Sequence, residues 1–511
     1  MHGGKRDFDF GPRRVGETGV ACANLLRRIV AMLIPTGEIG ADAVFICAAA
    51  PCVLFYEFIG RPIFGLAFAA AMLIALPVFR TTPAAASARL TCALAAITLT
   101  TLGGEGRLFA ALPDWLVRDA VLHDLVTQPW PFVYRLDGID WWLRAPLGMY
   151  LLPAAIGKLL GGKAAMLALW AQNSSAIYAV LRLLSASSRT VRSATVVMVF
   201  CLFSGWDLIG AFVLRGGMIR DIGWWAGLFQ YSSTVTLAFW VPNHALAGWF
   251  VAALLLLWDQ RRVGIAALMA GSAATMLWSP FALLGALPFL AKAIIEAIGE
   301  RRIFRTESAR LLPLTVGLLP VLAYLDSDSA GVPHGLQKLT PTFLIIYPLF
   351  ITLELLPWIA VNALTETVPQ GFARSTYLLA LGVLLLIPFY HMGAGNDFVM
   401  RASIPALAVI AVTAGHTTFE LFSARGFWRI AVVGIVVVIG AATGLMQARR
   451  VLTTPNAGVS RCDLIEAWGS NPTPKTHYLA SITAVPPRLR PPRPHILVTG
   501  PPRAPCVDRR L

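Results

Sequence analysis

Three polar clusters in an otherwise apolar sequence hold the side chains whose types could do chemistry. The first cluster covers residues 113–146 and contains Asp114, Asp119 and His123. Carboxylates and imidazoles transfer protons, and they also bind divalent metals. Asp119 and His123 are four residues apart, so they share one face if this stretch is helical. The alternative interpretation is a solvated amphipathic helix with tryptophans at the membrane interface.

Two further clusters add basic side chains of the kind that bind phosphate. Their candidate residues are Arg215, Arg220 and His244 in the stretch 215–249, and Asp397 and Arg401 in the stretch 391–405. Arg401 precedes an apolar run, where its planar fork of donors could hold a phosphate or anchor the chain at the interface. The sequence VPNH breaks the chain just before another apolar run, which could place His244 in an aqueous cavity. A packed histidine with a satisfied hydrogen bond is the alternative.

The composition requires these clusters to be positioned by membrane-spanning helices. The chain has 511 residues, of which 57% are hydrophobic and only 14% charged, and its mean hydropathy is +0.68. Soluble domains are about 45–50% apolar and about 25% charged, so a soluble globule, a disordered chain and a disulfide scaffold are excluded. The net charge is +15, but no patterned basic–aromatic stretch is present. We therefore expect no nucleic-acid partner.

The sequence predicts an all-α polytopic bundle in which about thirteen apolar runs cross the membrane within a body at 41–446. These runs are 41–59, 62–79, 90–102, 164–184, 193–214, 245–258, 263–278, 281–298, 311–325, 341–361, 377–390, 403–422 and 427–446. The apolar run 146–160 is too short to cross. We expect it to lie on the outer surface, because the arginines that follow the next span then fall in the cytoplasm.

Basic residues orient the spans, because cytoplasmic loops carry an excess of Lys and Arg. The polar stretch that opens the long loop 103–163 has no such excess, so this loop is placed outside and is expected to carry short surface helices. The segment 1–40 is placed in the cytoplasm, with a helix on the membrane surface over 24–35. An odd number of spans puts the Pro-rich tail 447–511 outside. We expect the protein in an inner or plasma membrane.

Two of the seven cysteines, Cys462 and Cys506, lie in this tail. If the tail is outside, they could pair as a disulfide in an oxidising compartment. The alternative is two free thiols. The remaining cysteines lie in or near apolar segments and are expected to pack as small core residues.

Glu354 lies inside an apolar run and marks the main alternative function. Charges within the membrane often line a transport pathway, which would make the protein a transporter or flippase of a lipid-linked or small hydrophobic substrate. One such carboxylate offers few partners for an ion or proton relay. The sequence contains no GxxxxGK[ST] and no HExxH motif, so nucleotide-driven transport and zinc proteolysis have no support.

Several stretches resemble the GT-C superfamily of polytopic glycosyltransferases, which use lipid-linked sugar donors. The acidic residue of PDW, Asp114, directly follows a span and opens the first large outer loop. The run RAPLGMYLLPAAIGKLLGG resembles a proline-started segment in the protein mannosyltransferase-like and lipopolysaccharide-modifying members. NDFVMRASIPAL and FWVPNHAL resemble stretches of bacterial polytopic proteins associated with the superfamily. The chain departs from the pattern in having three predicted spans before the loop and Trp115, not a second acid, after Asp114.

The resemblance implies transfer of a hexose or pentose from a polyprenyl-phosphate donor to an acceptor on the outer face. Asp114 would be the general base, with Asp119 as a second candidate. The phosphate would be held by Arg401, Arg215 or Arg220, and the donor or acceptor would be contacted by His244, His123 and Asp397. A divalent metal, bound by Asp114, Asp119 and His123, is left open. A glycan polymerase or ligase with a similar body is a further alternative.

Overall fold

A computed structural model describes most of the chain in atomic detail. The described residues are 40–79, 88–185, 190–217, 221–301, 305–364, 372–393, 395–423, 426–456, 459–460, 462–469, 475–499 and 506. The surface helix predicted over 24–35 and the candidate phosphate ligand Arg220 lie outside the described residues.

Among the described residues, nine helical segments are long and apolar enough to cross a membrane. They are α2 (Ala41–Phe58), α3 (Pro62–Ala75) with the turn η1 (Leu76–Phe79), α7 (Gly162–Leu184), α8 (Thr190–Leu202) with α9 (Asp207–Arg215), α13 (Pro280–Gly299), α14 (Arg305–Asp326) with η5 (Ser329–Gly331), α15 (Pro341–Ala363), α17 (Asp397–Ala402) with α18 (Ile404–Ser423), and α19 (Phe427–Thr453). All nine overlap runs that the sequence predicts to span. The protein is therefore a helical bundle with the character of a multi-pass membrane protein.

The other four predicted runs form helices that are not among these nine candidate spans. They are α4 (Arg89–Leu102), α11 (Pro242–Asp259), α12 (Ile265–Ala274) with η4 (Thr275–Leu277), and α16 (Arg374–Leu386) with η6 (Ile387–Phe389). Three of these segments are shorter than the nine candidates, so the count of thirteen stays a prediction. The doubtful run 146–160 contains only the ten-residue helix α6 (Leu151–Leu160), which is too short to cross a bilayer.

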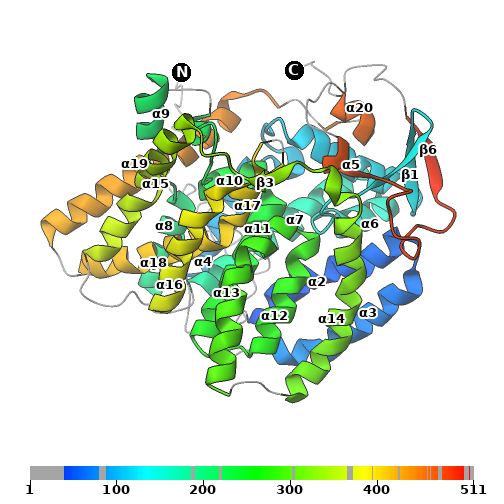
Figure 1. The fold of residues 1–511 in the computed structure, drawn as a ribbon, viewed down its shortest axis with the longest axis horizontal. Helices are drawn as coiled ribbons and strands as arrows, with labels where there is room; N and C mark the ends of the chain where they lie inside the picture. Colours follow the sequence, from blue (N-terminus) through cyan, green and yellow to red (C-terminus); the bar gives the residue numbers. More distant parts are fainter. Residues whose placement is uncertain are drawn as a thin grey trace, which may run out of the picture. The chain divides into compact units, whose positions relative to one another are not determined.

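The helix α11 forms the centre of the bundle. Every side chain from Pro242 to Trp258 is buried, and the helix packs against α7, α12, α13 and α18. Pro242 occupies its first turn, where the missing N–H costs nothing and the fixed φ favours helix initiation. Figure 1 shows α11 between α13 and α7. This position explains why α11 reads as apolar around its whole circumference.

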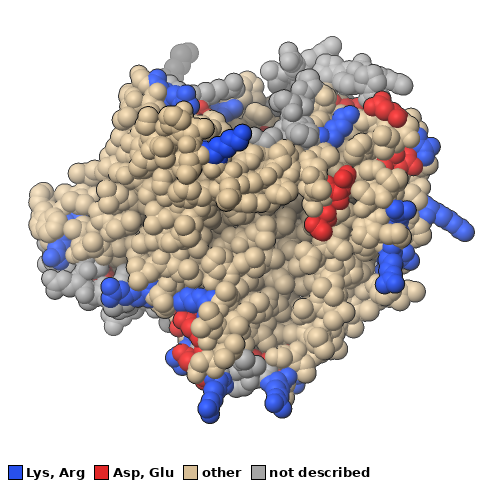
Figure 2. Space-filling view, viewed as in Figure 1, with Lys and Arg blue, Asp and Glu red and all other residues tan. Residues whose placement is uncertain are grey.

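Apolar side chains on the outside of the bundle point away from the protein. Leu66 and Leu73 of α3, Ile295 of α13 and Leu319 of α14 are all largely exposed. Figure 2 shows that Lys, Arg, Asp and Glu lie mainly toward the edges of this face, with a wide uncharged area between them. In a lipid bilayer this uncharged area would contact acyl chains and not water.

Two small sheets add strand structure that the all-α prediction lacked. The larger sheet has the order β5–β2–β1–β6, with β1 (Phe132–Leu136), β2 (Ile139–Leu143), β5 (Leu479–Ser481) and β6 (His495–Val498). The hairpin β1–β2 turns at Asp137 and Gly138, which both have positive φ (52° and 76°). An Asp-Gly pair is well suited to such a turn. The smaller sheet pairs β3 (His334–Leu336) with β4 (Tyr390–Met392).

The larger sheet joins the long loop to the C-terminal tail. β1 pairs in parallel with β6, and β2 pairs antiparallel with β5. In Figure 1, β1, β6, α5 (Trp115–Thr127) and α20 (Leu464–Trp468) lie together. Loop and tail therefore lie on the same side of the bundle, a relation that the predicted topology requires.

Further contacts fix the tail to α5. Cys462 is bonded to Cys506 as a disulfide, and Cys462 packs against Ala120. Asp119 accepts a hydrogen bond from the backbone N–H of Ser460 at 3.4 Å, and Asp124 accepts one from Leu464 at 2.8 Å. The sequence predicts that the tail begins at residue 447. The structure continues α19 to Thr453, and the tail beyond it contacts the loop through the bonds to Asp119 and Asp124 and the strand pairings.

Candidate functional site

Two neighbouring cavities lie at the end of the bundle that carries the loop and the tail. We call the first the cationic cavity; it measures about 110 Å³. Its charged and polar lining consists of Arg118, Arg144, Tyr150, Asn243, His244, Asp397, Arg401, His477 and Tyr478. We call the second the acidic cavity; it measures about 240 Å³. Its lining includes Asp114, Asp221, Trp224, Gln230, Ser232, Thr236, Trp240, Asp397 and Arg401.

The short helix α17 contributes Asp397 and Arg401 to both cavities and so forms a wall that they share. Arg401 Nη2 lies 2.9 Å from Asp397 Oδ1, an ion pair between residues one helical turn apart. The guanidinium also lies over the Phe281 ring at 5.9 Å from its centre. The turn before α17 needs Gly393, which has a φ of +86° and whose added Cβ would meet Asp397 Oδ2 at 2.7 Å. The sequence prediction of a turn followed by a phosphate ligand at Arg401 therefore has a structural basis in this wall.

Arg118 and His244 form the floor of the cationic cavity. Arg118 is buried on α5, and its Nη1 donates to Asn243 Oδ1 at 3.0 Å and to the Tyr150 hydroxyl at 3.4 Å. Burial lowers the pKa of Arg118, but the nearby Tyr150, Tyr478 and Asp114 outweigh it and raise that pKa, so the guanidinium stays charged. His244 Nδ1 lies 2.7 Å from Ser279 Oγ. The VPNH break thus places His244 at a cavity, and a hydrogen bond fixes its ring.

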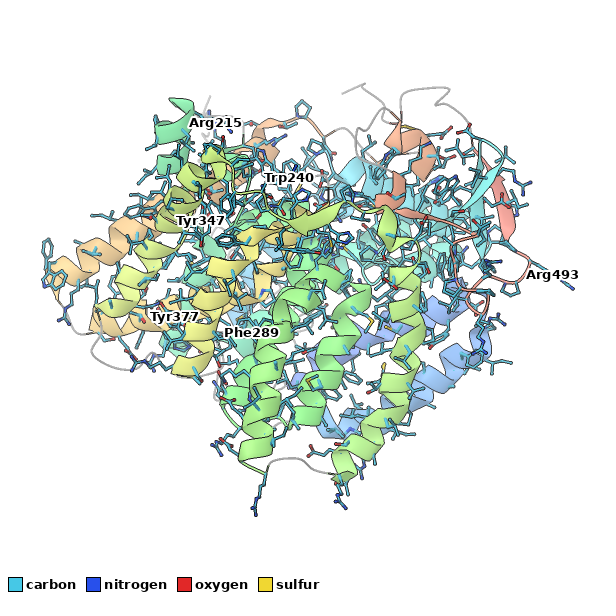
Figure 3. All side chains as sticks on the ribbon, in the orientation of Figure 1. Arg215, Trp240, Phe289, Tyr347, Tyr377 and Arg493 are labelled. Atoms are coloured by element: carbon cyan, nitrogen blue, oxygen red, sulfur yellow. A yellow bond between two sulfur atoms is a disulfide. The ribbon has the colours of Figure 1, made fainter. Side chains whose placement is uncertain are left out.

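The acidic cavity brings Asp114 close to groups from distant parts of the chain. Asp114 is exposed at the start of α5. Asp221 accepts a hydrogen bond from Gln447 Nε2 at 3.3 Å, and burial raises its pKa while Arg450 opposes that shift. Trp240 is fixed by a bond to Gln447 Oε1 at 3.2 Å and by the Arg450 guanidinium over its ring at 5.4 Å. Figure 3 labels Trp240 in this upper part of the protein.

Three of the predicted site residues lie elsewhere. Asp119 forms an ion pair with Arg107 and accepts a hydrogen bond from the tail residue Ser460. Burial raises the pKa of Asp119, and the nearby Arg107 opposes that shift. His123 lies 3.3 Å from Asp124, whose hydrogen bond raises the pKa of the imidazole. Arg215 donates to the carbonyl of Trp225 at 3.2 Å and lines neither cavity. In Figure 3, Arg215 is drawn at the end of α9, apart from Trp240.

The metal site suggested by Asp114, Asp119 and His123 does not fit the geometry. Asp114 faces the acidic cavity, Asp119 faces Arg107, and His123 faces Asp124. Within the described ranges, no three His, Cys, Asp or Glu side chains gather in a way that could hold a metal ion. We therefore derive no chemical step through a metal.

Glu354 is buried and bonded, and it lines neither cavity. Its Oε1 accepts a hydrogen bond from Trp225 Nε1 at 3.0 Å. The neighbouring Asp207 accepts bonds from Ser204 and Thr443 at 2.7 and 2.6 Å. This carboxyl pair ties α9, α15 and α19 together and gives no observation in favour of a transport path.

Sequence reasoning missed many of the polar residues that line the cavities. In the cationic cavity they are Arg118, Arg144, Tyr150, Asn243, His477 and Tyr478, and in the acidic cavity Asp221, Trp224, Gln230, Ser232, Thr236 and Trp240. Arg118 and Arg144 lie in the first polar cluster, so their charge was a usable signal. His477 and Tyr478 belong to the tail, and nothing local connects them with residues more than 300 positions earlier. Comparison of the chain with protein-family models, with curated protein sequences and with solved structures finds no match in any of the three.

Proposed function

We propose that the protein is an integral membrane glycosyltransferase that moves a sugar from a polyprenyl-phosphate donor to an acceptor hydroxyl on the outer face of the membrane. The observation that carries this proposal is the shared wall formed by Asp397 and Arg401 between a cationic and an acidic cavity. One cavity has the charge to hold a phosphate. The other has a carboxylate, Asp114, with free access to an acceptor.

The chemistry follows from the two kinds of lining. Asp114 takes the proton from the acceptor hydroxyl as its oxygen bonds to the anomeric carbon of the sugar. The bond between that carbon and the phosphate oxygen breaks at the same time, and the phosphate leaves with the electron pair. Arg401 and Arg118 offset the charge that develops on the departing phosphate.

The acidic cavity also has the composition of a carbohydrate site. Trp224 and Trp240 offer aromatic surfaces for the C–H faces of a sugar ring. Gln230, Ser232 and Thr236 offer hydrogen-bond donors and acceptors for hydroxyl groups. A hydrophobic metabolite would leave these polar groups unpaired, which favours a polyhydroxylated substrate.

The test is transfer of radiolabelled sugar in membranes that contain the Asp114→Asn variant. Removing a general base lowers a rate by about 100- to 10,000-fold, so we expect at least about a hundredfold loss at equal expression. Asp137→Asn is the matched control, because Asp137 lies in the same loop but at the exposed β1–β2 turn. Unchanged transfer by Asp114→Asn would refute the assignment of the base.

The same membranes separate transfer from transport and polymerisation. A flippase would move a labelled lipid-linked sugar across proteoliposomes without forming a new glycosidic bond. A polymerase or ligase would release products of increasing length or a whole transferred glycan. Either result, with no single-sugar product, would refute the proposed reaction.

A further inference from the structure

The C-terminal tail supplies part of the wall of the cationic cavity. Its turn η7 (Lys475–His477) and the following Tyr478 reach the cavity directly before β5. The backbone N–H of Arg144 donates to the Tyr478 carbonyl at 2.7 Å, and its guanidinium bonds to the Thr476 carbonyl. The Tyr478 ring packs edge-on against Trp468 at 5.2 Å. These contacts fix the tail so that His477 and Tyr478 face the cavity.

His477 is a tail residue at the cavity whose imidazole can still form a hydrogen bond to a ligand. Its Nδ1 lies 3.7 Å from Asp397 Oδ2, a loose contact. Its Nε2 is buried and has no hydrogen-bond partner among the described residues. A buried nitrogen without a partner is costly unless a ligand or water satisfies it. His477 lines the cationic cavity, so a ligand that enters the cavity is the natural partner for this nitrogen.

The surroundings of His477 disfavour a charged imidazole while the cavity is empty. Burial lowers the pKa of His477, Arg401 and Arg144 lower it further, and Asp397 opposes them. Arg118, Tyr150, His244 and Tyr478 complete the titratable groups that share the cavity with it. An anion in the cavity would offset the arginine charges and offer an acceptor to Nε2. Both effects favour the imidazolium.

We infer that His477 is a ligand for an anionic phosphate-type group in the cationic cavity and takes up one proton when that group binds. No covalent step is involved: the proton comes from solvent and stays on the imidazole until the anion leaves. The inference deepens the proposed function, since the donor phosphate would be the anion, and it rests on that function only for the identity of the ligand.

The experiment measures anion binding to the purified full-length protein in detergent. Sulfate is the probe, because its own charge does not change between neutral and mildly acidic pH. Titration calorimetry in two buffers of different ionisation enthalpy reports proton uptake directly. We expect the wild-type protein to take up as much as one proton per sulfate bound, and its affinity to fall by at most about tenfold per unit of rising pH.

Two variants connect the proton to His477. His477→Gln keeps a polar side chain that cannot be protonated, so we expect weaker binding with no buffer-dependent enthalpy. Lys475→Gln is the matched control, because Lys475 lies in the same turn, is exposed and does not line the cavity. It should bind sulfate and take up the proton as the wild-type protein does.

Several outcomes would overturn the inference. They are sulfate binding by wild-type protein without proton uptake, equal uptake by His477→Gln, and absence of sulfate binding. If His477→Gln fails to fold, His477→Asn takes its place as the variant that cannot be protonated. Proton-linked binding in a protein that transfers no sugar would leave the anion site standing and refute the proposed function.

A competition arm identifies the source of the anion. We expect a short-chain prenyl phosphate to displace sulfate at least about tenfold more effectively than inorganic phosphate, because the lipid group adds apolar contact. Equal displacement by the two would overturn the lipid headgroup as the ligand and assign free phosphate.

Discussion

Asp124 is the buried anchor between the long loop and the tail, and its removal should release the tail from α5. The carboxylate is fully buried. It accepts hydrogen bonds from the Tyr134 hydroxyl at 2.7 Å and from the Leu464 backbone N–H at 2.8 Å. Both donors are themselves buried. In Asp124→Ala, each loses its partner in a place that water does not reach.

The size of the effect follows from these two donors. A buried donor left without a partner costs about 1–3 kcal/mol, so the variant should lose about 2–6 kcal/mol of local stability. About 1–3 kcal/mol of this loss falls on the docking of the tail, because one of the two donors, the Leu464 N–H, belongs to it. A local opening that is easier by about 2 kcal/mol raises the amide exchange rate by roughly thirtyfold.

Hydrogen exchange followed by mass spectrometry measures this directly on peptides that cover residues 462–469. Asp140→Ala is the matched control, since Asp140 is a carboxylate of the same long loop and lies in β2, which pairs with the tail strand β5. Its 2.7 Å ion pair with Arg135 is partly exposed, with side-chain exposures of 28% and 43%. Such a pair is worth less than about 1 kcal/mol. We therefore expect less than about fivefold faster exchange at β1 and β2, and no change at 462–469.

Two results would contradict this reasoning. Exchange at 462–469 within about threefold of the wild-type rate in Asp124→Ala would mean that the hydrogen bond from Leu464 to Asp124 does not hold the tail. Equal acceleration of these peptides in Asp140→Ala would mean that general loosening of the sheet, and not the buried anchor, governs docking.

Two further predictions concern a buried carboxyl group, Glu105, and a half-buried one, Asp463, both outside the cavities. Burial raises the pKa of Glu105 well above its ordinary value of 4.5, so the folded state holds a proton that the unfolded chain releases as pH rises above that value. Glu105→Gln cannot ionise; it should therefore unfold at a higher temperature than the wild-type protein at pH 8, with the difference vanishing near pH 4. A difference that grows on acidification would contradict this. Burial and the nearby Asp124 and Glu466 raise the pKa of Asp463 to about 6. The contribution of neutral Asp463 to the docking of the tail on α5 is thus lost as pH rises from 3.8 through 6. Asp463→Asn keeps the N-cap of α20 without the charge, so exchange at 464–469 should be slower than in the wild-type protein at pH 8 and equal at pH 4. Faster exchange in the variant at pH 8 would refute the role of that charge.

Sequence reasoning succeeded where the signal was local. Nine apolar runs coincide with long apolar helices, because the length of a span is written in consecutive residues. The two turns before α11 and α17 were recognisable from VPNH and from the glycines before Asp397. Both deliver a side chain to a cavity, His244 and Arg401. An interruption of the helix at the end of a span is one of the few places where polar backbone and side chains can contact water.

Sequence reasoning failed to predict which neighbours the side chains of a helix face. Asp119 and His123 were expected on one face of a helix, and α5 is indeed helical over both. Spacing does not say what that face meets. Consecutive helical residues point about 100° apart, so Arg118 faces the cationic cavity while Asp119 faces Arg107 and the tail. The choice between them is made by packing with distant parts of the chain.

Assembly of the cationic cavity depends on contacts between the two ends of the chain. Arg118 comes from α5, Arg401 from α17 and His477 from the tail. The parallel pairing of Phe132 with His495 brings the tail to the loop, although most of the helices of the bundle lie between the two in the sequence. Polar groups of this kind cannot face acyl chains, so they gather at one end of the bundle. The price of such a distant arrangement is loop-closure entropy. It is offset by several independent clamps: two backbone bonds to Asp119 and Asp124, the strand pairings and the Cys462–Cys506 bond. A tail that served only as a spacer would need none of these clamps, which argues that its position at the cavity is what the fold maintains.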